Sequence, residues 1–141
     1  MVKFLHKIFQ RKDFTMTDYF ELYRSILVTI NECSPETGQE LFNALSSTDY
    51  ILREKDHNPY LIKDTLMTLD NLIRDGLVYG KITPTKSGNI YELSGLSSAG
   101  YQYLMEMKTP NFSDKLKKYI KENGIPLTPQ AITKFLAQLI F

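Results

Sequence analysis

Apolar residues recur at helical spacing along most of the chain, and capping residues divide this pattern into separate helices. A first helix is predicted over about residues 18–32, with Thr17 as its N-cap. Ser34-Pro35 then offers a cap and a first-turn proline for a second helix that ends near residue 45. The stretch 46–58 is mostly polar and leaves room for a brief strand.

The third predicted helix has the clearest periodicity. Asn58 is its expected cap, Pro59 suits the first turn, and Gly76 can adopt the left-handed conformation that ends a helix. Its apolar residues follow one another at intervals of four, three and four positions. They predict a buried stripe made of Ile62, Leu66, Leu69 and Ile73.

Two strands are predicted next, over about residues 77–82 and 90–93. The segment 83–89 between them is rich in turn residues, so the two strands form a hairpin. Three more helices are expected to begin at Ser97, Ser113 and Thr128-Pro129.

Three helices, a hairpin and a further helix follow the element order of a winged helix. In that fold the third helix packs across the first two, and the hairpin loop is the wing. The predicted fold class is therefore α+β, a winged helix with a C-terminal helical extension. The expected organisation is a basic amphipathic arm over residues 1–15, a winged-helix domain over 16–108 and a C-terminal helical pair over 109–141.

Two segments carry a family resemblance. Residues 72–78, LIRDGLV, and residues 96–104, LSSAGYQYL, together resemble the pattern that flanks the hairpin of winged-helix regulators. With residues 112–120 (FSDKLKKYI) and 133–137 (TKFLA), the chain also resembles a family of small uncharacterised phage and prophage proteins. That family combines a winged helix with a C-terminal helical pair and has no assigned activity. The resemblance implies a small regulatory or adaptor protein of phage or mobile-element type.

Composition narrows the class of protein further. The chain has 141 residues, is 43% hydrophobic and 23% charged, and contains no apolar run near the ~18 residues that a membrane span needs. Its one cysteine, Cys33, cannot form an internal disulfide. A cytoplasmic protein is therefore expected.

Candidate catalytic chemistry is sparse. His6 and His57 are the only histidines, too few with Cys33 for a zinc site. A nucleophile pair of Cys33 and His57 is conceivable, but a lone cysteine at a helix end is more often a packed or idle residue. Gly95-Leu96-Ser97 begins like a nucleophile elbow, but the next glycine, Gly100, comes one position too late. We expect no enzyme activity, no cofactor, no metal and no small-molecule substrate.

Double-stranded DNA is the partner that the predicted helix-turn-helix suggests by analogy. Residues of the third helix would read base edges, and residues of the hairpin would approach the phosphate backbone. The candidate nucleic-acid-binding residues are Asn58, Tyr60, Lys63, Asn71, Lys81, Lys86 and Asn89.

The charge balance argues against this partner. Residues 16–75 hold five basic and eleven acidic side chains, a net charge of −6, whereas residues 108–134 hold six lysines and two carboxylates. DNA binding is favoured if folding buries Asp64 and Asp70 away from Lys63, Lys86 and the lysines of residues 108–134. Otherwise the hypothesis is a protein-interaction module that binds a host protein, and the acidic helices would suit a basic partner.

The last predicted helix is too apolar to remain in water. It either folds back on the domain or pairs with the same helix of a second chain, and a homodimer is expected. The arm adds a second apolar surface that favours association, made of Phe4, Leu5, Ile8 and Phe9. The candidate dimerisation residues are Ile132, Phe135, Leu136, Leu139, Ile140 and Phe141.

Overall fold

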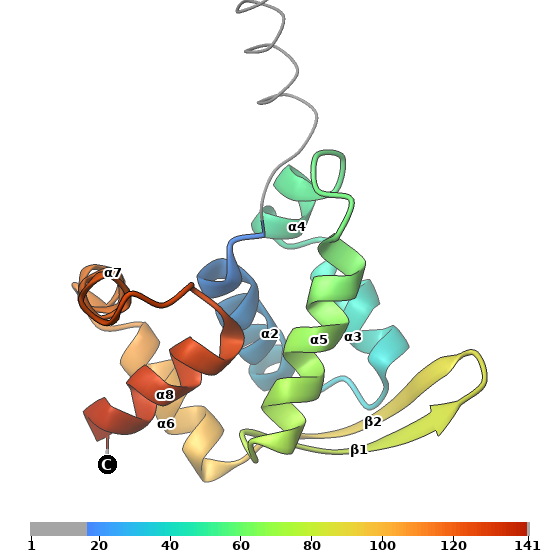
Figure 1. Ribbon diagram of the computed structural model, residues 1–141. Coiled ribbons are helices and arrows are strands. Elements are labelled where there is room, and N and C mark those ends of the chain that lie inside the picture. Colours follow the sequence, from blue (N-terminus) through green and yellow to red (C-terminus); the bar gives the residue numbers. More distant parts are fainter. Residues whose placement is uncertain (1–16, 141) are drawn as a thin grey trace, which may run out of the picture.

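The computed structural model describes residues 17–140. Over this range the chain is a mixed α+β protein with seven helices and one antiparallel hairpin (Figure 1). The elements, labelled as in Figure 1, are α2 (Tyr19–Cys33), α3 (Gly38–Leu45), α4 (Asp49–Glu54), α5 (Leu61–Arg74), β1 (Val78–Thr85), β2 (Gly88–Leu96), α6 (Ser98–Met107), α7 (Phe112–Asn123) and α8 (Pro129–Ile140).

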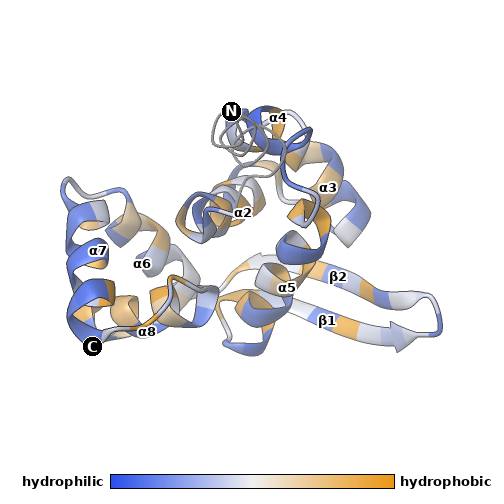
Figure 2. Ribbon diagram, turned by 45° about the horizontal axis from the view of Figure 1, so that its top comes forward, coloured by the Kyte–Doolittle hydropathy of each residue, from blue (hydrophilic) through white to orange (hydrophobic). Residues whose placement is uncertain are grey.

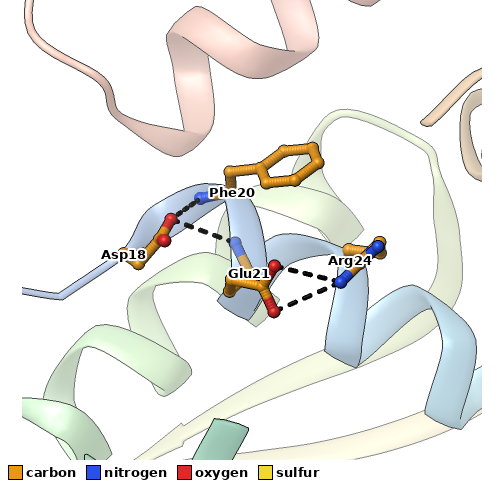
Figure 3. Close-up of polar contacts among 4 residues, drawn as sticks. All are labelled: Asp18, Phe20, Glu21 and Arg24. Carbon is orange, nitrogen blue, oxygen red and sulfur yellow. Dashed lines mark hydrogen bonds and ion pairs between the residues drawn. The ribbon is translucent and has the colours of Figure 1, made fainter. Parts of the chain in front are cut away.

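Helix α2 lies where the sequence predicts a helix, but its cap is Asp18 and not Thr17. The Asp18 carboxylate accepts hydrogen bonds from the backbone N–H groups of Phe20 and Glu21 (Figure 3). Glu21 pairs with Arg24 at 3.0 Å one turn later. Thr17 is used elsewhere: its hydroxyl donates to Asp64 on α5 and so ties the start of α2 to that helix.

The chain between α2 and α5 corrects two predictions. The second helix begins at Gly38, because the backbone of residues 36 and 37 pairs with the hairpin: the Glu36 carbonyl accepts from the Leu93 N–H at 2.9 Å, and Thr37 bridges Glu92. Thr37 then caps α3. The brief strand considered for 46–58 is instead the short helix α4, held by the buried ring of Tyr50.

Helix α5 occupies the predicted range but is rotated relative to the prediction. Its buried face is made of Leu61, Thr65, Thr68, Leu69 and Leu72, whereas Ile62 is 69% exposed. Threonines can occupy this core because their hydroxyls bond back to carbonyls one turn earlier, at 2.7 Å from Thr65 to Leu61 and 2.8 Å from Thr68 to Asp64. Of the predicted stripe, Leu69 is fully buried and Leu66 and Ile73 are half-buried against the core, so the prediction was wrong at Ile62.

The hairpin is longer and its turn tighter than predicted. β1 and β2 stay paired as far as Thr85 and Gly88, so only Lys86 and Ser87 form the turn. The predicted cap at its other end is confirmed. The Ser97 hydroxyl caps α6 by accepting from the Gly100 N–H at 3.0 Å. A Cβ at Gly100 would lie 2.0 Å from the Leu77 carbonyl oxygen, so α6 approaches the hairpin too closely for any other residue.

Helices α6, α7 and α8 share one hydrophobic core with the preceding elements. Phe112 stacks on Phe20 of α2 and contacts Phe135 of α8, with ring centroids 5.8 and 5.7 Å apart. The hydroxyls of Tyr23 and Thr133 are 2.7 Å apart and join α2 to α8. The predicted cap at Ser113 was wrong, since α7 begins at Phe112. The predicted cap at Thr128 is confirmed by its bond from the Ala131 N–H.

Candidate macromolecule-binding surface

Helix α5 presents the most unusual surface of the described chain. Ile62 is 69% exposed and Tyr60, just before the helix, is 61% exposed. Met67 and Lys63 are exposed on the same helix. Single apolar residues on a surface are ordinary, but a largely exposed isoleucine on a helix that buries two threonines is not.

A groove lies beside these residues. A hollow of about 470 Å³ opens between α3, the α4–α5 segment and α5, and its apolar lining includes Phe42, Leu45, Ile51, Leu61 and Ile62. A second hollow of about 380 Å³ shares Phe42 and runs past Leu66 to residues 89–92 of β2. The two hollows together are named the α3–α5 groove. It is shaped and lined to take large apolar side chains.

One basic and one acidic side chain line the α3–α5 groove: Lys55 lines the larger hollow and Glu92 the second. Lys63 follows Ile62 on α5 and is exposed, but it lines neither hollow. Within residues 17–140 neither lysine forms an ion pair, whereas the nearby Glu54 carboxylate pairs with Arg53 at 3.5 Å. The acidic charge counted over residues 16–75 is therefore not concentrated at the mouth of the groove.

The two carboxylates of α5 lie on different sides of the helix. Asp64 is half-buried and accepts from the Thr17 hydroxyl, toward the start of α2. Asp70 accepts from Arg74 Nε at 2.5 Å and from the Tyr91 hydroxyl at 3.4 Å. The hydrogen bond to Asp70 raises the pKa of the exposed Arg74 guanidinium. Neither carboxylate stands free at the exposed face of the helix.

Two of the predicted nucleic-acid-binding residues are not available to a ligand. Asn58 is only 3% exposed: its amide donates to the Thr17 hydroxyl at 2.7 Å, and its carbonyl accepts from the Tyr60 N–H. Asn71 is half-buried, and its amide nitrogen is shielded from solvent with no hydrogen-bond partner among the described residues. Both predictions are corrected, because tertiary packing covers positions that periodicity had placed outside.

The remaining five candidates are exposed but scattered. Tyr60 and Lys63 lie at the start of α5, and Asn89 lines the second hollow. On the hairpin, Lys86 lies in the turn, whereas Lys81 is paired in register with Glu92, which offsets its charge. The lysines of α7 lie at the opposite end of the molecule from the hairpin (Figures 1 and 2). Within residues 17–140, the basic groups are therefore spread over separate elements.

The predicted dimerisation residues are divided by the fold. Ile132, Phe135 and Leu136 are buried against the rest of the chain, which corrects their assignment to an intermolecular surface. These three side chains are buried because α8 folds back onto α2, α6 and α7. Leu139 and Ile140 keep exposed or partly exposed surface. Phe141 and the arm over residues 1–15 lie outside the described residues.

A polar junction lies where α2, α5, α6 and α8 meet. Burial raises the pKa of Tyr23, Tyr103 and Asp75, and the Asp75 charge further raises the pKa of both tyrosines. Both phenols therefore remain protonated near neutral pH. The junction holds α2 and α8 together through the hydrogen bond between the hydroxyls of Tyr23 and Thr133.

Sequence reasoning missed the α3–α5 groove because it assigned Ile62 to the core. A signal was present: residues 61, 65, 68 and 72 have helical spacing as regular as that of 62, 66, 69 and 73. The first set contains two threonines, so hydrophobicity alone favoured the second. The exposed Ile62 and its neighbours on α3 are the functional candidates that periodicity could not assign.

The other candidate chemistry is dispersed. Cys33 is exposed at the end of α2 and His57 is exposed in the α4–α5 segment, on different elements. Across residues 17–140 no three His, Cys, Asp or Glu side chains come together as a metal-binding group. No helix in this range is long and apolar enough to span a membrane. No protein-family model, no curated protein and no solved structure matches the chain.

Proposed function

We propose that the chain is a non-enzymatic regulatory or adaptor protein of winged-helix architecture that binds a protein partner through the α3–α5 groove. The observation that carries this proposal is the exposure of Ile62 beside an apolar hollow of about 470 Å³. A large aliphatic side chain left in water beside an open apolar hollow is typical of a protein-docking surface.

The topology supports the winged-helix part of the proposal. α2, α3 and α5 supply the three helices, and β1 and β2 supply the wing. The isolated bridge from Thr37 to Glu92 places the segment between the first two helices alongside β2. This support is an analogy of fold, so it says where a partner would meet the protein and not which partner it is. The phage or mobile-element origin stays a prediction from the sequence resemblance.

The chemistry of the groove favours one class of protein partner. Its apolar lining suits a segment with large apolar side chains, as in an amphipathic helix. Lys55 in the lining of the larger hollow and the exposed Lys63 lack ion-pair partners among the described residues and favour acidic groups at that hollow, whereas Glu92 lines the second hollow. The partner that fits is an amphipathic segment with acidic flanks, in place of the basic partner expected from the overall charge.

A labelled helical peptide tests this proposal. The probe carries leucines along one face and glutamates on both flanks, and a matched peptide carries lysines in place of the glutamates. Fluorescence anisotropy is expected to show at least about tenfold tighter binding of the acidic peptide, a difference of about 1.4 kcal/mol. K55E together with K63E should reverse this preference, and I62S should weaken binding of both peptides.

The matched control is L139S, which removes an exposed apolar side chain at the far end of the molecule. It should leave peptide binding unchanged. Equal binding of the two peptides, or equal effects of I62S and L139S, would overturn the groove as the docking site. Because Ile62 is exposed, loss of binding in I62S does not arise from unfolding, which circular dichroism verifies.

DNA binding is a second candidate, favoured by one observation. Lys63 and Lys86 are exposed without ion-pair partners in the described part of the chain, and Asp70 is neutralised by Arg74. Anisotropy with a labelled random duplex at about 50 and about 200 mM salt measures it, since phosphate contacts weaken steeply with salt. K63A and K86A should reduce any such binding, and its absence at low salt would eliminate DNA as a partner.

A further inference from the structure

The described chain begins at the edge of the α3–α5 groove. The Asn58 amide donates to the Thr17 hydroxyl at 2.7 Å, and Asn58 itself lines the larger hollow. The Asp18 N–H donates to the Tyr50 hydroxyl at 3.0 Å, which holds the backbone at this point against α4. The arm over residues 1–15 is therefore tethered beside the larger hollow.

The α3–α5 groove runs along the whole of α3. The larger hollow is lined by Leu45 and Ser46 at the C-terminal end of this helix. The second hollow is lined by Gly38 and Gln39 at its N-terminal end, and both hollows share Phe42. Because α3 has eight residues, the groove extends over about 12 Å. A segment that enters from the tether meets the larger hollow first and the second hollow, at β2, last.

The length and the apolar pattern of the arm fit this groove. As a helix, the stretch 3–12 would be about 15 Å long. Residues 13–16 can span roughly 13 Å when extended, enough to lead from Thr17 into the larger hollow. The large apolar residues of the arm that share one helical face, and would face the groove, are Phe4, Leu5, Ile8 and Phe9.

The charged residues of the groove differ in sign between its two ends. Near the tether, the larger hollow has one charged residue in its described lining, Lys55. At the far end, Glu92 lines the second hollow, and Glu36 and Glu92 together line an adjoining hollow. Glu40 accepts from the Glu36 N–H at 2.9 Å and adds a third carboxylate there. Lys81, in register with Glu92, offsets one of these charges, so the far end remains acidic.

The charges of the arm follow the order that matches these two ends. Its one carboxylate, Asp13, is nearest to the tether. The basic residues lie farther from the tether and are Lys3, Lys7, Arg11 and Lys12. When the arm enters the groove from the tether, Asp13 lies on the side of Lys55 and the basic residues approach the acidic end.

We infer that the arm occupies the α3–α5 groove of its own chain, so that a partner must displace it. This inference rests on the proposed function, because it names what regulates access to the same site. A short tether gives an effective concentration on the order of 1 mM. An intrinsic dissociation constant of about 0.1 mM would then keep the groove occupied in about nine molecules in ten. A partner therefore binds about tenfold more weakly than it would bind an open groove.

Paramagnetic broadening in the full chain tests where the arm docks. C33S removes the native thiol, and Q10C then carries a nitroxide on the polar side of the arm. In isotope-labelled protein, amides of α3 and of residues 89–92 should broaden, whereas those of α7 should not. When nitroxide-labelled chain is mixed with isotope-labelled chain that lacks the nitroxide, no broadening is expected, because the docking is intramolecular.

Variants of the arm test the order of charges. K7E together with R11E reverses two basic charges and should reduce the broadening of residues 89–92 at least threefold. K117E together with K118E is the matched control, since it makes the same change in net charge at exposed positions of α7. It should leave the broadening unchanged.

Peptide binding measures the consequence for the proposed function. I8S together with F9S removes two apolar residues of the arm, and should tighten binding of the acidic helical peptide about tenfold. L139S, which removes an apolar side chain far from the groove, should leave the affinity as it is.

Four results would overturn the inference. They are broadening at α7 in place of α3, broadening in the mixed sample, equal effects of K7E/R11E and K117E/K118E, and unchanged peptide affinity in I8S/F9S. Broadening in the mixed sample would assign the groove to the arm of a second copy. If the peptide binds neither wild type nor I8S/F9S while α3 is still broadened, the external partner is overturned and docking of the arm is supported, so the two proposals fail separately.

Discussion

Helices α5 and α8 use their apolar residues in opposite ways. α8 turns Ile132, Phe135 and Leu136 inward, where Phe135 packs on Phe112 and Tyr119. α5 buries Thr65 and Thr68 and leaves Ile62 in water. Both helices lie in the same protein and contact the same helix, α2.

This difference separates apolar residues that stabilise the fold from apolar residues that are candidates for binding a partner. α8 follows the rule that burial of apolar surface stabilises the fold, so its inner face is explained by folding alone. α5 departs from that rule, because an isoleucine at the Thr65 or Thr68 position would bury more apolar surface. Departures of this kind occur at functional surfaces, so the exposed Ile62 supports the proposed docking role of the α3–α5 groove, whereas Leu136 is accounted for by the core.

The largest expected effect contrasts these two residues directly. L136A removes a fully buried side chain and should lower the free energy of unfolding by about 2–5 kcal/mol. I62A should change it by less than about 0.5 kcal/mol, because Ile62 is 69% exposed. Urea denaturation followed by circular dichroism measures both. Similar losses in the two variants would show that Ile62 belongs to the core after all.

A smaller effect is expected from the buried threonines of α5. T68V replaces a fully buried hydroxyl by a methyl group of similar shape, and the Asp64 carbonyl keeps its helical partner. Unfolding free energy should rise by up to about 1 kcal/mol, since the lost hydrogen bond is replaced by apolar burial. T109V is the control, because Thr109 makes the same kind of bond at an exposed helix end. A clear loss of stability in T68V would mean that the hydrogen bond of the Thr68 hydroxyl stabilises α5.

The smallest effect concerns Asp75, at the end of α5 in the polar junction. Burial raises the pKa of its carboxyl above the ordinary 3.8, so folding favours the protonated form. The stability this provides is present at low pH and is lost as pH rises from about 4 through the raised pKa. D75N should therefore be slightly more stable than wild type at pH 7, and this advantage should vanish below about pH 4.

Thermal unfolding across this pH range measures the effect, with D56N as a control for the loss of one exposed carboxylate. An equal gain in D75N and D56N would assign the effect to net charge. A gain in D75N that persists at low pH would show that the Asp75 carboxylate is not destabilised by burial.

Local signals in the sequence were sufficient wherever one segment sets its own structure. The Ser97 cap and the Thr128 cap were predicted and are present, because each depends on residues a few positions apart. The position of α2 and the hairpin between α5 and α6 were predicted for the same reason. Helical and strand periodicity are properties of the chain itself.

Only the tertiary structure decided which faces are covered. Residues 36 and 37 left the predicted helix because β2 offered them backbone partners, and Asn58 was buried because Thr17 lies against it. On α5, two stripes of equal spacing differ by one residue. Periodicity sets the spacing of a buried stripe, but its rotation depends on the neighbouring helices and strand. That rotation placed Ile62 at the surface and created the α3–α5 groove.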